Sequence, residues 1–114
     1  MAIYHLALVR DWEAAVAAGE YRVSTLGRSF DEVGFIHAGH AHQVAGVAEA
    51  FYAGVTEPLC VLTVDVETAL ASGAELIEED GGEGQLYPHI YAAIDPAWVT
   101  EVRPAGFERG RFVW

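Results

Sequence analysis

Residues 58–66 read PLCVLTVDV and give the strongest strand signal in the chain. Their nearly continuous apolar character is typical of a central strand that is buried on both faces. Cys60, the only cysteine, lies in this run, where a thiol behaves as a small buried hydrophobic group rather than as a nucleophile. We therefore predict a sheet built around residues 58–66.

Shorter stretches on both sides of this run also have the composition of strands. They are residues 2–9, 34–38, 74–79, 87–94 and 98–103. Pro88 lies in the fourth of them and indicates an edge strand or a strand start, because proline cannot donate to a ladder. Residues 20–33 look irregular with one short helical turn, and the acidic, glycine-rich residues 80–85 (DGGEGQ) are predicted to form a loop.

Three helices are predicted between these strands. Asp11 can cap a helix over residues 12–18 that stops at Gly19. In residues 40–52, four apolar side chains recur on one helical stripe, namely Val44, Val47, Ala48 and Phe51. A short helix is expected over residues 67–72, and the apolar tail that ends at Trp114 is expected to dock on the body. Because strands and helices do not alternate strictly, we predict a single α+β domain over residues 1–114 with mixed or antiparallel sheets.

The charge and the apolar pattern exclude several classes of partner. The net charge is −11, and all six basic residues are arginines. A field of this sign repels nucleic acid, whereas one or two arginines are enough to bind a small anionic ligand. No apolar run approaches the ~20 residues that span a bilayer, and the first residues lack the basic lead-in of a signal peptide. Together with the single cysteine, these features predict a cytoplasmic protein without a membrane partner.

The histidines are the most informative candidates for a functional site. His5, His37 and His89 each lie in a separate, strand-like apolar segment. Burying an imidazole is costly unless both nitrogens find partners, so three such residues suggest that they meet in one cleft. The alternative is that each is a structural histidine at a strand end. The tyrosines beside them, Tyr4, Tyr87 and Tyr91, would then either wall a pocket for a planar ring or pack in the core.

Two further groups of residues have side chains that could carry chemistry. Glu78 and Glu79 end a predicted strand, and one of them could reach a cleft that is lined by histidines; the alternative is an exposed acidic strand end. His37, His40 and His42 offer three imidazoles within six residues, as some zinc sites do. Residues i and i+2 of a helix point about 200° apart, however, so His40 and His42 would not share one ion, and no metal site is predicted.

Several motifs taken together resemble a known family. They are IYHL at residues 3–6, GFIH at 34–37 and PHIY at 88–91, with Glu78-Glu79 between the last two. In this order they resemble domain-of-unknown-function family 952, a set of small bacterial and some eukaryotic proteins. The match covers nearly the whole chain. Ala38-Gly39 replaces the Cys-Ser or similar pair that usually follows GFIH, and Ala92 replaces a glycine that many members have after PHIY.

The resemblance implies a fold and, through it, a possible substrate. Family members look like the ADP-ribosyltransferase fold, in which two small sheets and two to three short helices surround a cleft that holds NAD. The resemblance implies that His5 grips the NAD, that His37 takes the second strand position, and that Glu79 or Glu78 is the catalytic glutamate. The I-H segment is also similar to the V-H segment of RNA two-prime phosphotransferases, which use NAD to remove a phosphate. His89 has no counterpart.

Three functional hypotheses follow. The first is an NAD-dependent transferase, in which Glu79 stabilises an oxocarbenium-like ribose and His37 orients the ligand or transfers protons. NAD would be its substrate, and no certain cofactor is predicted. The second is a binding module that kept the cleft and lost the chemistry, and the third is a metal-assisted hydrolase. In all of them the partner is a small molecule or nucleotide, and no oligomeric state is predicted. The expected ligand contacts are Tyr4, Arg10, Ser24, His89 and Tyr91, with Arg22 as an alternative to Arg10.

Overall fold

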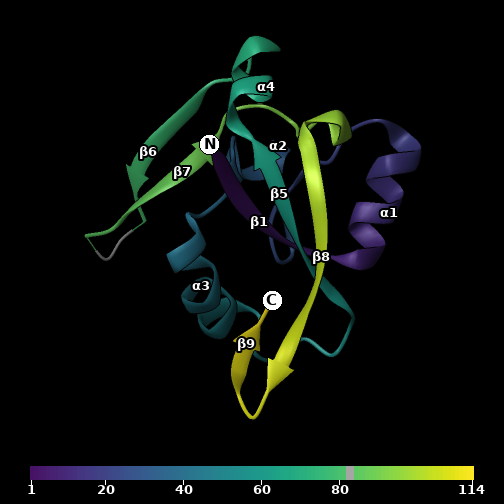
Figure 1. Ribbon diagram of the computed structural model, residues 1–114, viewed down its shortest axis with the longest axis vertical. Helices are drawn as coiled ribbons and strands as arrows, with labels where there is room; N and C mark the ends of the chain where they lie inside the picture. The colour runs from purple at the N-terminus through teal and green to yellow at the C-terminus, as the bar shows by residue number, and fades with distance from the viewer. Residues whose placement is uncertain (82–83) are drawn as a thin grey trace.

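The computed structural model describes residues 1–81 and 84–114 (Figure 1). Its largest sheet is antiparallel with the strand order β1-β5-β8-β9. These strands are β1 (Ala2–Leu8), β5 (Leu59–Asp65), β8 (Val99–Glu108) and β9 (Arg111–Val113). The central position predicted for residues 58–66 is confirmed, because β5 pairs with β1 on one side and β8 on the other. Val61, Leu62 and Val64 of β5 are fully buried.

A second antiparallel sheet has the order β4-β7-β6. It consists of β4 (Ile36–His37), β6 (Leu76–Asp80) and β7 (Leu86–Ile90). The edge or first position predicted from Pro88 is wrong, since β7 is the middle strand and Pro88 lies at its centre. The Pro88 carbonyl accepts the Ala38 N–H, 3.0 Å away. In an antiparallel strand, the amide nitrogen of a residue faces the same side as its carbonyl. The nitrogen of Pro88, which has no hydrogen, therefore faces the point where β4 has just ended, so few ladder hydrogen bonds are lost.

The remaining elements are short. The helices are α1 (Val9–Ala18), α2 (Phe30–Val33), α3 (Val44–Phe51) and α4 (Val66–Ala71), with 3₁₀ turns η1 (Ala41–Gln43) and η2 (Pro96–Trp98). Residues 20–33 were expected to be mostly irregular with one short helical turn. They contain β2 (Val23–Thr25), β3 (Arg28–Ser29) and α2. Among the described residues there are thus four α-helices instead of two or three, and none is long and apolar enough to cross a bilayer.

The start of α1 differs from the sequence prediction. The helix begins at Val9 with Leu8 as its N-cap, so Asp11 lies in the first turn and does not cap it. Strand β1 runs directly into the helix, and an acidic side chain in the first turn still interacts favourably with the helix dipole. The predicted stop at Gly19 is confirmed, since this residue adopts the left-handed conformation with φ 88°.

Two hydrophobic clusters hold the layers together, and β1 and β5 contribute to both. The first includes Ile36, Leu62 and Ile90 and joins the two sheets; the second includes Leu6, Ala48 and Val61 and packs α3 against the larger sheet. A backbone bridge between Tyr4 and Gly39, with two hydrogen bonds of 2.8 Å, connects β1 to the segment after β4. This bridge places the smaller sheet beside α3 (Figure 1).

The chain end docks on the body, as predicted. The Trp114 ring lies against Tyr4 with their centroids 5.1 Å apart, and Phe112 is buried in β9. Glu49 of α3 accepts the Phe112 N–H at 3.0 Å. The antiparallel sheets and short helices confirm the predicted α+β class.

Candidate functional site

His5 of β1 has both ring nitrogens hydrogen-bonded within the protein. Its Nδ1 is 2.7 Å from the His37 carbonyl oxygen and its Nε2 is 2.9 Å from the Tyr21 hydroxyl. A carbonyl only accepts, so Nδ1 carries the proton and Nε2 accepts from Tyr21. Burial lowers the pKa of His5 from 6.5 to about 4, which keeps it neutral. His5 therefore supports the backbone at His37 and has no ring nitrogen left for a ligand.

His37 and His89 lie side by side on one face of the smaller sheet. They are directly opposite each other in the β4–β7 pair, and opposite residues project to the same face. Their ring centroids are 5.3 Å apart. Burial, assisted by the neighbouring His89, lowers the pKa of His37 to about 4. Two of the three predicted histidines therefore share one wall, with His5 supporting it from β1.

Glu79 holds His89 from the strand on the other side. The Glu79 Oε1 atom is 2.8 Å from His89 Nδ1 and also accepts a 2.5 Å hydrogen bond from the Tyr91 hydroxyl. The bond from Tyr91, and then that from His89, lowers the pKa of Glu79, so this carboxylate is ionised. The same contact raises the pKa of Tyr91. Because an ionised carboxylate only accepts, His89 carries a proton on Nδ1.

The other nitrogen of His89 has no partner among the described residues. Nε2 is buried and makes no hydrogen bond within the described part of the chain; the same holds for the Ser24 hydroxyl. The Phe35 ring stacks on the imidazole, with centroids 4.0 Å apart and planes 12° apart. Buried polar atoms nearly always find a partner in native proteins, so these two atoms mark places where another molecule can bond.

His89 and Ser24 both line a cavity of about 500 Å³, a size within the usual range for small-molecule sites. The smaller sheet contributes His37, Tyr87 and His89 to its wall, with Phe35 beside them. Helix α3 and the turn before it provide the opposite wall, and the β2–β3 segment closes one side with Ser24, Thr25 and Arg28. A further space of about 20 Å³ adjoins Ser24 and His37 and reaches Tyr4 and His5. This is room for about one water molecule.

Arg28 is the arginine of the cavity, and sequence reasoning missed it. Its position depends on the turn between β2 and β3, for which the sequence gives no functional signal. Arg10 instead pairs with Glu57 at 2.9 Å, and Arg22 pairs with Glu20 and Asp31. Neither Arg10 nor Arg22 lines the cavity.

The structure separates the two candidate glutamates. Successive residues of a strand point to opposite faces, and Glu79 contacts His89 whereas Glu78 is 2.9 Å from His40 Nε2. Neither carboxylate lines the cavity. The Tyr91 hydroxyl likewise bonds to Glu79. Tyr4 lines only the space of about 20 Å³.

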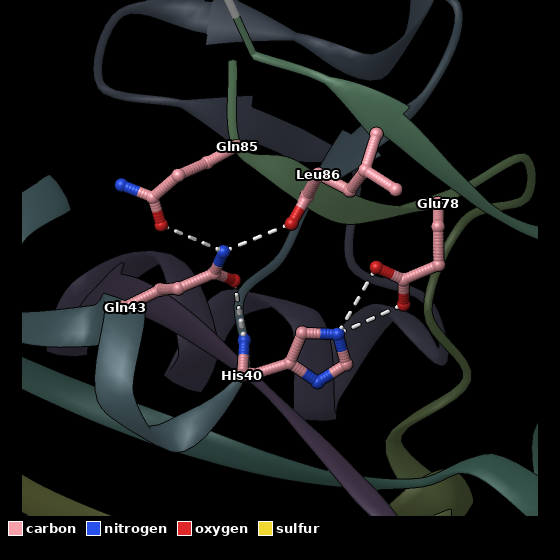
Figure 2. Close-up of polar contacts among 5 residues, drawn as sticks. All are labelled: His40, Gln43, Glu78, Gln85 and Leu86. Atoms are coloured by element: carbon pink, nitrogen blue, oxygen red, sulfur yellow. Dashed lines mark hydrogen bonds and ion pairs between the residues drawn. The ribbon is translucent and has the colours of Figure 1, made fainter. Parts of the chain in front are cut away.

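A polar cluster beside the cavity joins the turn before α3 to the β6–β7 hairpin, and Gln43 and Gln85 of this cluster line the cavity (Figure 2). The Gln43 side chain accepts the His40 N–H at 2.9 Å, and its amide donates to the Leu86 carbonyl at 2.9 Å and to Gln85 Oε1 at 3.2 Å. The His40–Glu78 contact lies beside it. The bonds of Gln43 link the helix and the sheet that face each other across the cavity.

The histidines of the metal hypothesis are not arranged around an ion. The His40 and His42 rings lie parallel, 6.2 Å apart, and His40 is directed to Glu78. Within residues 1–81 and 84–114, no three His, Cys, Asp or Glu side chains are grouped so that they could hold a metal.

Comparisons with known proteins identify the family. The family described as "Protein of unknown function (DUF952)" matches residues 7–102. The chain belongs to the DUF952 family. Three similar solved structures are all of protein CC0527 from Caulobacter crescentus, with 25% sequence identity. Its crystal structure and that of a double mutant have TM-scores of 0.83 and cover 99% of this chain and 94% of that one.

The solution NMR structure of the same Caulobacter protein has a TM-score of 0.76, with 96% and 90% of the two chains covered. No curated protein matches the sequence. These findings confirm the DUF952 family and its fold. The resemblance to ADP-ribosyltransferases rests on the sequence motifs alone.

Proposed function

We propose that this DUF952 protein binds a small nucleotide in the cavity between the smaller sheet and α3, with NAD as the first candidate. The observation that carries the proposal is the buried, unpartnered Nε2 of His89 on the cavity wall, combined with the anchoring of Nδ1 by Glu79. This arrangement holds the imidazole in a fixed orientation and leaves one nitrogen for a ligand. A donor such as the amide of nicotinamide or the amino group of adenine would satisfy it.

The aromatic side chains of the cavity suit a planar ring. Phe35 is stacked on His89, and Tyr87 lies 5.1 Å from the His37 ring on the same wall. Aromatic rings bind other planar rings by offset or edge-on stacking. His37 adds a second, neutral imidazole beside His89. Because it carries no charge, it can orient the ligand without repelling a hydrogen-bond donor of that ligand.

The β2–β3 side of the cavity suits phosphate. Arg28 and the unpartnered Ser24 hydroxyl lie there and can both donate to phosphate oxygens. With a net charge of −11, the protein as a whole repels a polyanion, which favours a short nucleotide over RNA or DNA. In this proposal Arg28 takes the role that the sequence suggested for Arg10.

The proposal covers binding and leaves out the nicotinamide cleavage that the resemblance implies. Stabilising an oxocarbenium-like ribose requires a carboxylate beside the ligand. Glu79, to which the resemblance assigns this role, is instead bonded to His89 and Tyr91 and does not line the cavity. Asp80 does line the cavity, but the resemblance gives it no such role. His5 and Tyr4 support the site from behind, where they shape the backbone at His37 and Gly39.

Saturation-transfer NMR with NAD, ADP-ribose and nicotinamide tests the proposal. We expect NAD and ADP-ribose to bind the wild type and to bind His89→Gln and His37→Ala weakly or not at all. Arg28→Ala should weaken NAD and ADP-ribose but leave nicotinamide, which has no phosphate, unaffected. Arg10→Ala is the matched control and should bind all three ligands as the wild type does. Absence of binding by all three ligands would refute nucleotide binding.

A further inference from the structure

We infer that the cavity is also a reaction site, in which His89 Nε2 removes the proton from a hydroxyl group while Glu79 holds Nδ1. This inference rests on the proposed function only in requiring that small molecules enter the cavity. It goes beyond binding because it assigns His89 as a general base and Glu79 as its positioning residue.

The first support is the order of the hydrogen bonds. The Tyr91 hydroxyl donates a hydrogen bond to Glu79, and the Nδ1–H of His89 donates another to the same carboxylate. A carboxylate held from two sides cannot easily rotate, so it fixes both the tautomer and the orientation of the imidazole. This is the role of the carboxylate in carboxylate–histidine pairs that act as general bases. The free lone pair is then on Nε2.

The second support is a comparison with His5 in the same protein. Both rings are almost fully buried, with exposures of 2% for His5 and 5% for His89. His5 shows how a structural histidine is satisfied here, with one partner on each nitrogen. Within residues 1–81 and 84–114, His89 has a partner on one nitrogen only, and it lines the cavity whereas His5 does not. The unpartnered nitrogen therefore belongs to a residue of the cavity wall. The atom itself has almost no exposed surface, so a small substrate reaches it by displacing a side chain that covers it.

The proton transfer balances without an external reagent. The O–H bond of a water molecule or ligand hydroxyl breaks, its electron pair stays on oxygen, and the lone pair of Nε2 forms the new N–H bond. The imidazolium charge is compensated by the Glu79 carboxylate, 2.8 Å from Nδ1. The oxygen then becomes a nucleophile. Ser24 and Arg28 line the same cavity and can donate hydrogen bonds to the negative charge that develops on the electrophile.

Hydrolysis of p-nitrophenyl acetate is the test, because this small ester reports a reactive base without knowledge of the natural substrate. Water gives a proton to Nε2 and its oxygen attacks the ester carbonyl. The C–O bond to p-nitrophenolate breaks and acetic acid forms. Nε2 returns its proton to solvent, and acetic acid loses a second proton to solvent to give acetate. Because general-base catalysis typically contributes ~100-fold or more, we expect His89→Gln to lower the protein-dependent rate by at least about tenfold. Slower hydrolysis in D₂O is expected if the proton moves in the rate-limiting step.

Adjacent glutamates provide a matched pair of variants. Glu79→Gln should lower the rate because it removes the charge that balances the imidazolium. Glu78→Gln should keep the wild-type rate, since Glu78 binds His40 outside the cavity. Melting curves establish that each variant is folded. If His89→Gln does not fold, Glu79→Gln and acylation of the wild type by diethyl pyrocarbonate decide the question. Mass spectrometry then identifies the acylated residues, and loss of the hydrolysis rate must coincide with modification of His89.

The outcomes separate this inference from the proposed function. A wild-type rate in folded His89→Gln, or loss of the rate while His89 stays unmodified, overturns the general base. Binding of NAD without His89-dependent hydrolysis also overturns it and leaves the nucleotide site standing. His89-dependent hydrolysis without nucleotide binding supports the base and removes the nucleotide.

Discussion

Acidification from pH 7 to pH 5 is expected to destabilise the protein by about 2 kcal/mol through His5 alone. Burial lowers the pKa of His5 from 6.5 in the unfolded chain to about 4 in the fold. Between these values the unfolded state binds more protons, so the contribution of His5 is fully present above pH 6.5 and is lost as the pH falls towards 4. At ~1.36 kcal/mol per pKa unit the whole contribution is about 3 kcal/mol, of which about 2 kcal/mol is lost by pH 5.

Urea unfolding followed by tryptophan fluorescence at pH 7, 6 and 5 measures this effect. His5→Gln is the comparison, because an amide keeps polar contacts but does not titrate in this range. His37, whose pKa is also lowered to about 4, contributes to both proteins and cancels in the difference. Carboxylates with a lowered pKa, such as Asp65, contribute stability that is lost only at lower pH. Equal pH dependence of the two proteins, or a His5 pKa near 6.5 by NMR, would refute the reasoning.

Three further predictions use other contacts. Tyr21→Phe leaves the buried Nε2 of His5 without a donor and should cost about 1–3 kcal/mol in urea unfolding; a change within error would mean that water replaces the hydroxyl. Gly81→Ala would place a Cβ atom 2.4 Å from Cδ1 of Tyr87, so the ring must move and the affinity for NAD should fall, which titration would show. Burial raises the pKa of Cys60 to about 11, so iodoacetamide at pH 8 should label it only after unfolding; rapid labelling of the native protein would contradict its burial.

The central features of the fold were predictable from local pattern. An apolar run without alternation identified β5, and a glycine with positive φ ended α1 where expected. The position of Pro88 was not predictable, because it depends on where β4 ends, and β4 is a two-residue strand defined only by its pairing with β7. The start of α1 was missed because β1 continues directly into the helix without a polar cap.

The candidate site was predictable in its residue types and not in its contacts. The sequence indicated that histidines from separate segments meet, but the pairing register decides that His37 faces His89. A shift of one residue in β6 would exchange Glu78 and Glu79, so the sequence left both open. Arg28 enters the cavity through the β2–β3 turn, a tertiary placement that no motif encodes.

Direct observation of the His89 ring by ¹⁵N NMR during a titration with NAD tests the central claim most directly. We expect NAD to shift the Nε2 resonance of His89 and the resonances of the neighbouring His37 ring. The Nε2 resonance of His5, which is bonded to Tyr21, should stay nearly unchanged. If NAD, ADP-ribose and nicotinamide all leave the His89 and His37 rings unperturbed at saturating concentration, the cavity is not a nucleotide site and the account is contradicted.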